Sequence, residues 1–100
     1  MKILFAVVRT PGRAWDPARE MRAQAQWPEH AAFMNGLARR GFVFLGGPIG
    51  GAHDALLAVA AGDEAEVRAV LAQDPWSVAG ILTIKSVERW TILLDSSAPD

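Results

Sequence analysis

His30 and Asp74 are the residues of this chain whose types and positions best suit acid–base chemistry. His30 stands at the start of an apolar helical pattern, where an imidazole has little structural use, and Asp74 follows a second such pattern in the motif Asp74-Pro75-Trp76. An imidazole has a reference pKa of about 6.5 and exchanges protons near neutrality, and a carboxylate beside it can fix its tautomer. A fold that brings the two residues together would make them an acid–base pair.

Both residues also have ordinary structural interpretations. His30 could be a half-buried histidine bonded to backbone groups. An aspartate before a proline commonly closes a turn or caps a helix with its own carboxylate. Their spacing in the sequence does not decide between a catalytic and a structural role.

The composition excludes several classes of site. The chain has no cysteine, which excludes disulfides, thiol nucleophiles and cysteine-ligated metals. Its two histidines and its carboxylates show no recognised metal-ligand spacing, so we expect neither a metal nor a cofactor. Ten basic and eleven acidic residues give a net charge of −1 without a basic block, which argues against nucleic-acid binding.

The apolar runs are also too short for a membrane protein. They fall well below the ~18–20 residues that cross a bilayer. No cleavage site follows the first run, so it reads as a strand rather than a signal peptide. The sequence therefore predicts a cytoplasmic protein without a membrane partner.

Hydrophobic periodicity and turn residues predict the order βαββαβ in one domain over residues 1–95, with a frayed polar tail over 96–100. This is the order of an α+β, ferredoxin-like fold with an antiparallel sheet. A long loop with one helical turn covers residues 13–26. The other predicted elements are strands over 3–8, 42–45 and 55–61, a fourth strand from Ile81 with a bulge near Lys85 and Ser86, a short extra strand over 90–94, and helices that open at Pro28 and at Asp63, the second ended by Pro75.

The predicted strands suggest that both faces of the sheet are covered. The first strand, over residues 3–8, is apolar at both odd and even positions. A sheet with one face in water should alternate instead. Two helices cover one face, and a second copy of the same sheet is the simplest cover for the other. We therefore expect a homodimer through the sheet face.

Four arginines lie in or beside the long loop: Arg9, Arg13, Arg19 and Arg22. Their planar guanidinium groups could bind an anionic substrate by bidentate pairing, although arginines in a loop are more often simply solvated. His53 lies in a glycine-rich turn, where we expect it to be exposed and without a functional role.

Four motifs, in this order, resemble those of the YCII-related domain family: Trp27-Pro28-Glu29-His30-Ala31-Ala32-Phe33-Met34, Gly41-Phe42-Val43, Gly46-Gly47-Pro48 and Asp74-Pro75-Trp76. The resemblance covers nearly the whole chain. It implies a ferredoxin-like fold that dimerises through its sheets as a dimeric α/β barrel. It also implies an active-site pair that matches His30 and Asp74, in a pocket between helix, sheet and partner chain.

Members of the resembled family differ in activity, and this chain departs from their pattern. One branch removes chloride from a chlorinated hydroxyquinol, and muconolactone isomerases share the fold. Trp27 stands where many members have an arginine, and Phe33 stands where many have a tyrosine. Both changes would make the pocket more apolar and less suited to an anion.

Three functions are compatible with these residues. The first is a small cofactor-free lyase or isomerase, in which His30 moves a proton on an aromatic, enol or lactone substrate and Asp74 orients the imidazole. The second is a non-catalytic dimer that binds a small ligand as a sensor, carrier or accessory domain. The third is an interaction protein with a filled interior and no pocket beside His30. For the first, the expected apolar wall consists of four residues: Phe5, Phe33, Pro48 and Trp76.

Overall fold

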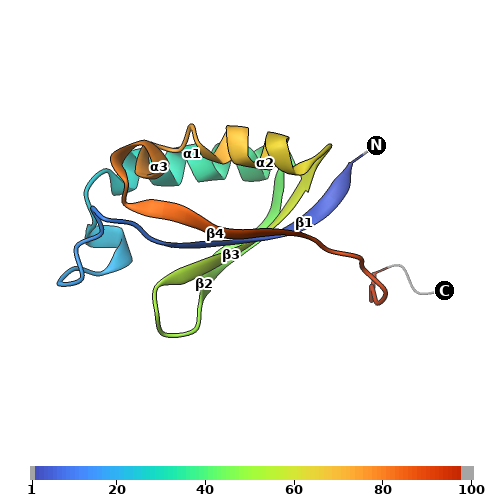
Figure 1. The fold of residues 1–100 in the computed structure, drawn as a ribbon, viewed down its shortest axis with the longest axis horizontal. Helices are drawn as coiled ribbons and strands as arrows, with labels where there is room; N and C mark the ends of the chain where they lie inside the picture. The colour runs from blue at the N-terminus through green and yellow to red at the C-terminus, as the bar shows by residue number, and fades with distance from the viewer. Residues whose placement is uncertain (1, 98–100) are drawn as a thin grey trace.

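The computed structural model describes residues 2–97 as a single sheet with its helices on one face (Figure 1). The strand order is β2-β3-β1-β4, and each neighbouring pair is antiparallel, which confirms the ferredoxin-like α+β fold. Residues 98–100 of the predicted tail lie outside the described residues. The elements are β1 (Ile3–Pro11), the 3-10 helix η1 (Met21–Ala23), α1 (Trp27–Arg39), β2 (Val43–Ile49), β3 (Asp54–Ala61), α2 (Glu64–Leu71), α3 (Pro75–Ala79) and β4 (Leu82–Arg89).

β1 lies in the middle of the sheet, and it extends beyond the predicted end at Val8. Pairing with both neighbours, β3 and β4, carries the strand to Arg9, and pairing with β4 alone carries it on to Pro11. This extension places Arg9 inside the sheet rather than in the loop that follows.

The bulge predicted near Lys85 and Ser86 is present in β4. Val8 pairs with Ser86, whereas the next residue of β1, Arg9, pairs with Ile84. Lys85 is thus the extra residue, in the two-against-one arrangement of a bulge.

Three further predictions were wrong, each because of tertiary context. β2 does not stop at Gly46 but continues through Pro48 to Ile49, since β2 is an edge strand and tolerates a proline. Residues 90–94 form no strand, because the pairing of β4 with β1 ends at Arg89 and the chain then runs out past the sheet (Figure 1). Pro75 does not exclude further helix; it opens the short helix α3, as a proline at the first helical position can.

The core consists of two separate hydrophobic clusters between the helices and the sheet. The larger one joins α1 and α2 to the sheet through ten buried residues, among them Val7, Leu37 and Val67. The smaller one lies at the other end of the helical layer, where Trp15 and Trp76 pack with Ile81 and Leu82. Burial of side chains of this size stabilises each cluster by about 1.5–3 kcal/mol per residue.

Within residues 2–97, no α-helix covers the opposite face of the sheet (Figure 1). The strand register places apolar residues of three strands on it: Leu4, Ala6, Val8, Leu45, Leu56, Ala58 and Ala60. Leu45 at the edge is 76% exposed. No helix within residues 2–97 is long and apolar enough to cross a membrane.

The end of β1 approaches the α3–β4 connection so closely that Gly12 has no room for a side chain. A Cβ there would lie 2.3 Å from the carbonyl oxygen of Gly80, and both backbones are held by the bond from the Gly12 N–H to Ile81 O at 2.8 Å. We expect Gly12→Ala to destabilise the protein by about 1–3 kcal/mol in urea unfolding. Gly36→Ala is the control, because that helical glycine has open space and alanine should add about 0.5–1 kcal/mol. Equal stability of the two variants would contradict the close approach.

Candidate active site

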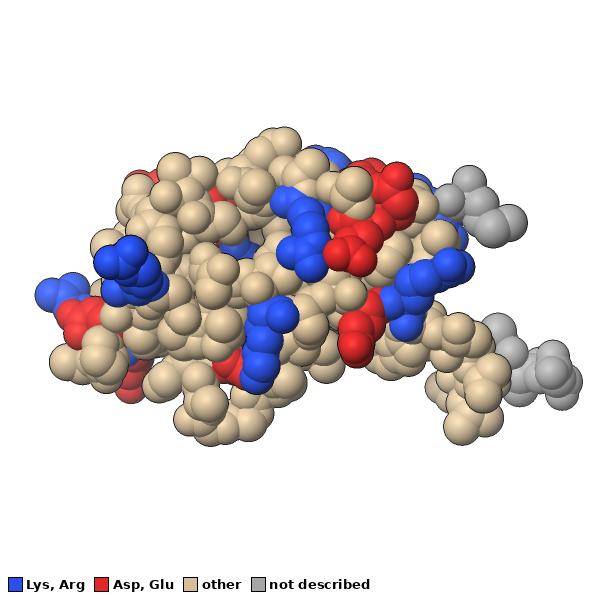
Figure 2. Space-filling view, in the orientation of Figure 1, with Lys and Arg blue, Asp and Glu red and all other residues tan. Residues whose placement is uncertain are grey.

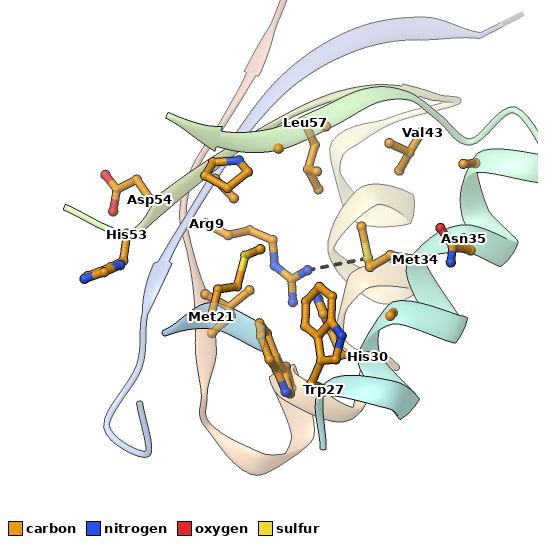
Figure 3. A pocket seen from close by; sticks show the side chains of 18 of the residues that line it. Arg9, Met21, Trp27, His30, Met34, Asn35, Val43, His53, Asp54 and Leu57 are labelled. Carbon is orange, nitrogen blue, oxygen red and sulfur yellow. Dashed lines mark hydrogen bonds between the residues drawn. The ribbon is translucent and has the colours of Figure 1, made fainter. Parts of the chain in front are cut away.

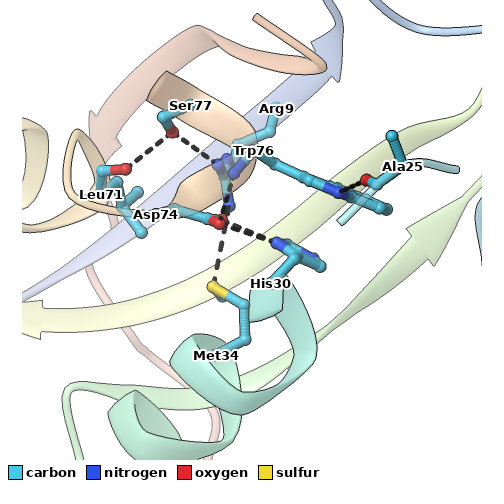
Figure 4. Close-up of polar contacts among 8 residues, drawn as sticks. All are labelled: Arg9, Ala25, His30, Met34, Leu71, Asp74, Trp76 and Ser77. Atoms are coloured by element: carbon cyan, nitrogen blue, oxygen red, sulfur yellow. Dashed lines mark hydrogen bonds and ion pairs between the residues drawn. The ribbon is translucent and has the colours of Figure 1, made fainter. Parts of the chain in front are cut away.

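The structure brings His30 and Asp74 into direct contact beneath the helical layer (Figure 4). Nδ1 of His30 lies 2.8 Å from Oδ2 and 3.0 Å from Oδ1 of Asp74. Asp74 is fully buried, and His30 is 8% exposed. The contact that the sequence spacing left open is therefore made.

Two helix termini position this pair. His30 lies in the first turn of α1, whose start is fixed by Pro28 and by a left-handed backbone at Gln26 (φ 61°). Asp74 is the N-cap of α3, where its Oδ1 accepts a hydrogen bond from the Trp76 backbone N–H at 2.9 Å. The capping interpretation and the pairing interpretation of Asp74 are thus both correct, because the cap uses one oxygen and leaves the other for additional donors.

Arg9 is the third member of the cluster, although from the sequence we had expected it to lie beside the loop with the other arginines. It is 1% exposed, and its Nη1 lies 2.9 Å from Oδ2 of Asp74. Its Nη2 donates to Ser77 Oγ at 2.8 Å, and that hydroxyl donates to Leu71 O at 2.7 Å. The position of Arg9 in β1 is the signal that could have singled it out: it continues the buried alternation of Phe5 and Val7, so an arginine there must have an internal partner.

The polar contacts decide the charge of the carboxyl and the tautomer of the imidazole. Burial alone would raise the pKa of Asp74, but the hydrogen bonds from His30 and from the Trp76 N–H and the charge of Arg9 outweigh it, and the pKa is lowered from 3.8. An ionised carboxylate can only accept, so Nδ1 of His30 must be the donor. In the neutral ring, the lone pair is then on Nε2, the atom that can accept a proton.

Tryptophans surround the imidazole. Trp76 stacks on His30 with the ring centroids 3.8 Å apart and the planes 7° from parallel. The ring centroid of Trp27 lies 5.7 Å from that of His30 and 5.6 Å from that of Trp76. The indole N–H of Trp76 donates to Ala25 O at 2.7 Å, which fixes the ring that supports the histidine. The ring of His30 therefore has one orientation, held by a carboxylate on Nδ1 and by an indole on its face.

A cavity of about 640 Å³ opens beside this cluster, between α1 and the edge strand β2. Figure 3 shows the side chain of Arg9 reaching into the space between the sheet and α1, next to Trp27, His30 and Met34. The lining is mostly apolar, which is typical of a small-molecule site. The cavity argues against the interaction-protein hypothesis, which expected a filled interior beside His30.

Two of the four expected wall residues lie elsewhere. Pro48 and Trp76 line the cavity. Phe5 is buried in the larger hydrophobic cluster, and Phe33 packs against that cluster. Phe5 faces the helices from β1 but is not among the residues that line the cavity.

The long loop supplies wall residues that the sequence did not reveal. Gln24 is 4% exposed and ties the loop together: its Nε2 donates to the carbonyl oxygens of Asp16 and Arg19 at 2.7 and 3.0 Å, and its Oε1 accepts from the Asp16 N–H. These hydrogen bonds fix the loop in the position in which Trp15, Met21 and Arg22 line the cavity. His53, which we expected to have no role, also lines the cavity, with its ring 5.3 Å from that of Trp15.

Two buried donors have no acceptor within the described part of the chain. They are Nε of Arg9 and Nε1 of Trp15. Neither group can accept a hydrogen bond, and a buried donor without an acceptor costs about 1–3 kcal/mol. Among residues 2–97, no group of three or more histidine or acidic side chains is arranged to hold a metal ion.

Comparison with solved structures shows the same fold in a known enzyme. The chain is similar to 5-chloro-2-hydroxyhydroquinone dehydrochlorinase (TftG) from Burkholderia phenoliruptrix AC1100, described in complex with 2,5-dihydroxybenzoquinone. The TM-score is 0.62 and the identity 24%, over 89% of this chain and 94% of that chain. No protein-family model and no curated protein matches the chain. The likeness shows the fold, and the site must be argued from its own geometry.

The buried carboxylate makes the stability of the protein depend on pH. Because the pKa of Asp74 is lowered on folding, its contribution is fully present above the unfolded pKa and is lost as the pH falls through the folded value. We expect Asp74→Asn to cost about 3–5 kcal/mol at pH 7 in urea unfolding, and the difference from the wild type to shrink below about pH 4.

Two controls isolate this effect. Asp16→Asn replaces an exposed carboxylate whose partner Arg19 is also exposed, and should change stability by no more than about 0.5 kcal/mol. Repeating the Asp74→Asn comparison in a His30→Gln background removes the titration of the imidazole. A difference that stays constant down to pH 2 would show that Asp74 is not the stabilising carboxylate.

Proposed function

We propose that this protein is a small cofactor-free enzyme of the lyase or isomerase type, related to the YCII-like proteins, in which His30 transfers a proton on a small aromatic, enol or lactone substrate. The single observation that carries the proposal is the bond between Nδ1 of His30 and the buried carboxylate of Asp74 at the wall of a cavity. This arrangement leaves Nε2 as the proton acceptor and gives Asp74 the task of orienting and charge-balancing the ring.

The surroundings of the pair support proton transfer to a planar substrate. Trp27, Trp76 and Met34 offer flat or polarisable surfaces around His30, on which an aromatic or enol ring can pack. A site of low polarity strengthens the attraction between an imidazolium and the anion left on the substrate. The fold is similar to that of an enzyme that is named after a chlorinated hydroxyhydroquinone and is described with a bound hydroxyquinone. Such compounds are the first substrates to test.

The proposal predicts that His30 is essential for turnover but not for folding. The assays are chloride release from 5-chloro-2-hydroxyhydroquinone and NMR detection of ring-proton exchange in 2,5-dihydroxybenzoquinone. His30→Gln should lower the rate about 10²–10⁴-fold, the usual contribution of a general acid–base group, because glutamine can bond to Asp74 but cannot carry the proton.

Glu29→Gln is the matched control for this variant. Glu29 is the neighbouring residue in α1, is exposed and does not line the cavity, so its substitution should leave the rate unchanged. Full activity of His30→Gln on a substrate that the wild type turns over would refute the catalytic role. Binding of these compounds without any reaction in the wild type would favour the second hypothesis, a non-catalytic ligand-binding protein.

We also propose that the protein is a homodimer that buries the bare face of the sheet. On that face Val8 lies on the central strand β1, opposite Leu56 of β3, and apolar residues continue to the edge at Leu45. The chain that runs out past the end of β4 exposes two more apolar side chains, Leu93 at 88% and Leu94 at 93%. Apolar surface of this extent on a small chain is typical of an interface, and two sheets stacked face to face would cover it in both copies.

Light scattering at micromolar concentration tests the dimer. We expect the mass of two chains for the wild type and of one chain for Val8→Glu, because a charge in the middle of the buried face would lose its hydration. Val78→Glu is the control: Val78 is 78% exposed on α3, on the helical side of the molecule, and its substitution should leave the dimer intact. A wild-type protein with the mass of one chain would contradict the proposal.

A further inference from the structure

The charges around the cavity are unevenly distributed. Four basic or potentially basic side chains line it: Arg9, Arg22, His30 and His53. Among the described residues, Asp54 is the one acid in the lining, and its carboxylate is already engaged by the hydroxyl of Thr10 at 2.7 Å and by Nζ of Lys85 at 3.4 Å. The space available to a ligand is therefore bordered by positive groups without a free negative one.

The buried ion pair adds to this asymmetry through its orientation. Arg9 lines the cavity, whereas its partner Asp74 does not. The pair as a whole is neutral, but its positive end faces the cavity and its negative end faces away. His30 and Trp27 belong to the first turn of α1, so the positive end of the helix dipole also points toward this region.

Arg22 supplies a positive charge at the mouth of the cavity. Its guanidinium carbon lies 5.8 Å from the centroid of the Trp27 ring, within the range of a cation–π contact. The described residues offer Arg22 no acidic partner within ion-pair distance. From the sequence we had expected Trp27 to make the pocket more apolar. Its ring instead contacts Arg22 from the loop, so this rim carries a positive charge. Over the face drawn in Figure 2, basic and acidic side chains are interspersed, so that face does not share the charge asymmetry of the cavity.

From these contacts we propose that the cavity selects the ionised form of a planar compound bearing an acidic oxygen, such as a phenolate or a hydroxyquinone anion, over its neutral form. Arg9 stabilises the anion from the inner wall, and Arg22 on Trp27 attracts it at the mouth. The inference rests on the proposed function in using the same cavity, but it concerns binding and requires no turnover.

The test uses 4-nitrophenol and its methyl ether, 4-nitroanisole, which have the same ring but differ in the ability to ionise. Equilibrium dialysis at low salt gives the two affinities, and the absorption spectrum of bound 4-nitrophenol reports its protonation state. We expect the phenolate spectrum in the complex and binding at least about tenfold tighter than that of the ether. Equal affinities, a bound neutral phenol, or no binding of either compound would overturn the inference.

Two variants test the part played by Arg22. Arg22→Gln should weaken phenolate binding by about threefold at low salt and leave the ether unaffected, and the effect should vanish at high salt because the arginine is exposed. Arg19→Gln is the control, since Arg19 is an exposed arginine of the same loop outside the lining. An equal loss in both variants would mean that general surface charge, not the rim of the cavity, attracts the anion.

The outcome is independent of the proton-transfer proposal. Equal binding of the two probes would overturn anion selectivity while turnover that depends on His30 remained intact. Selective phenolate binding combined with full activity of His30→Gln would refute the catalytic proposal and leave the anion site in place.

Discussion

The carboxylate of Asp74 is the interaction on which the arrangement of this protein depends. It is fully buried and accepts hydrogen bonds from three segments that are distant in the chain: β1 through Arg9, α1 through His30 and the first turn of α3 through the Trp76 N–H. Burying a charge is costly unless it is paired and bonded, and here both oxygens are satisfied. Removing any one donor would leave a buried charge short of a partner, so the three segments are held together by a common requirement.

The cluster lies between the two hydrophobic cores rather than inside either one. The larger core fixes the distance between α1 and the sheet, and the smaller core fixes α3 and the loop that carries Trp15. The polar residues thus lie between two hydrophobic clusters and are buried, so little water screens their charges. In such a setting hydrogen bonds are strong and side chains have few alternative positions, which is the condition that a preorganised acid–base pair needs.

The long loop after β1 turns this polar cluster into a site with a wall. The loop has little regular secondary structure, and three hydrogen bonds of the Gln24 side chain stabilise it instead. The loop in turn contacts α3 through the bond from the Trp76 indole to Ala25. Trp76 therefore makes three interactions: its backbone N–H bonds to the capping Asp74, its ring stacks on His30, and its indole N–H bonds to the loop at Ala25. Loops of this length in small domains are often functional, and here the loop also brings Arg22 to the mouth of the cavity.

The sequence by itself determined the βαββαβ order of the main elements, the ferredoxin-like fold, the bulge at Lys85 and the choice of His30 and Asp74 as candidate residues, because these follow from periodicity, turn residues and composition. It did not determine the role of Arg9, the helix that begins at Pro75, the continuation of β2 through Pro48 or the absence of a strand after Arg89. Each of these depends on the segment that lies beside the residues in the fold. Pairing with β4 extends β1 far enough to bury Arg9, and within residues 2–97 no strand pairs with the chain after Arg89. The tertiary structure also decided the shape and charge of the cavity, since its walls come from residues between Arg9 and Leu82 that only folding brings together.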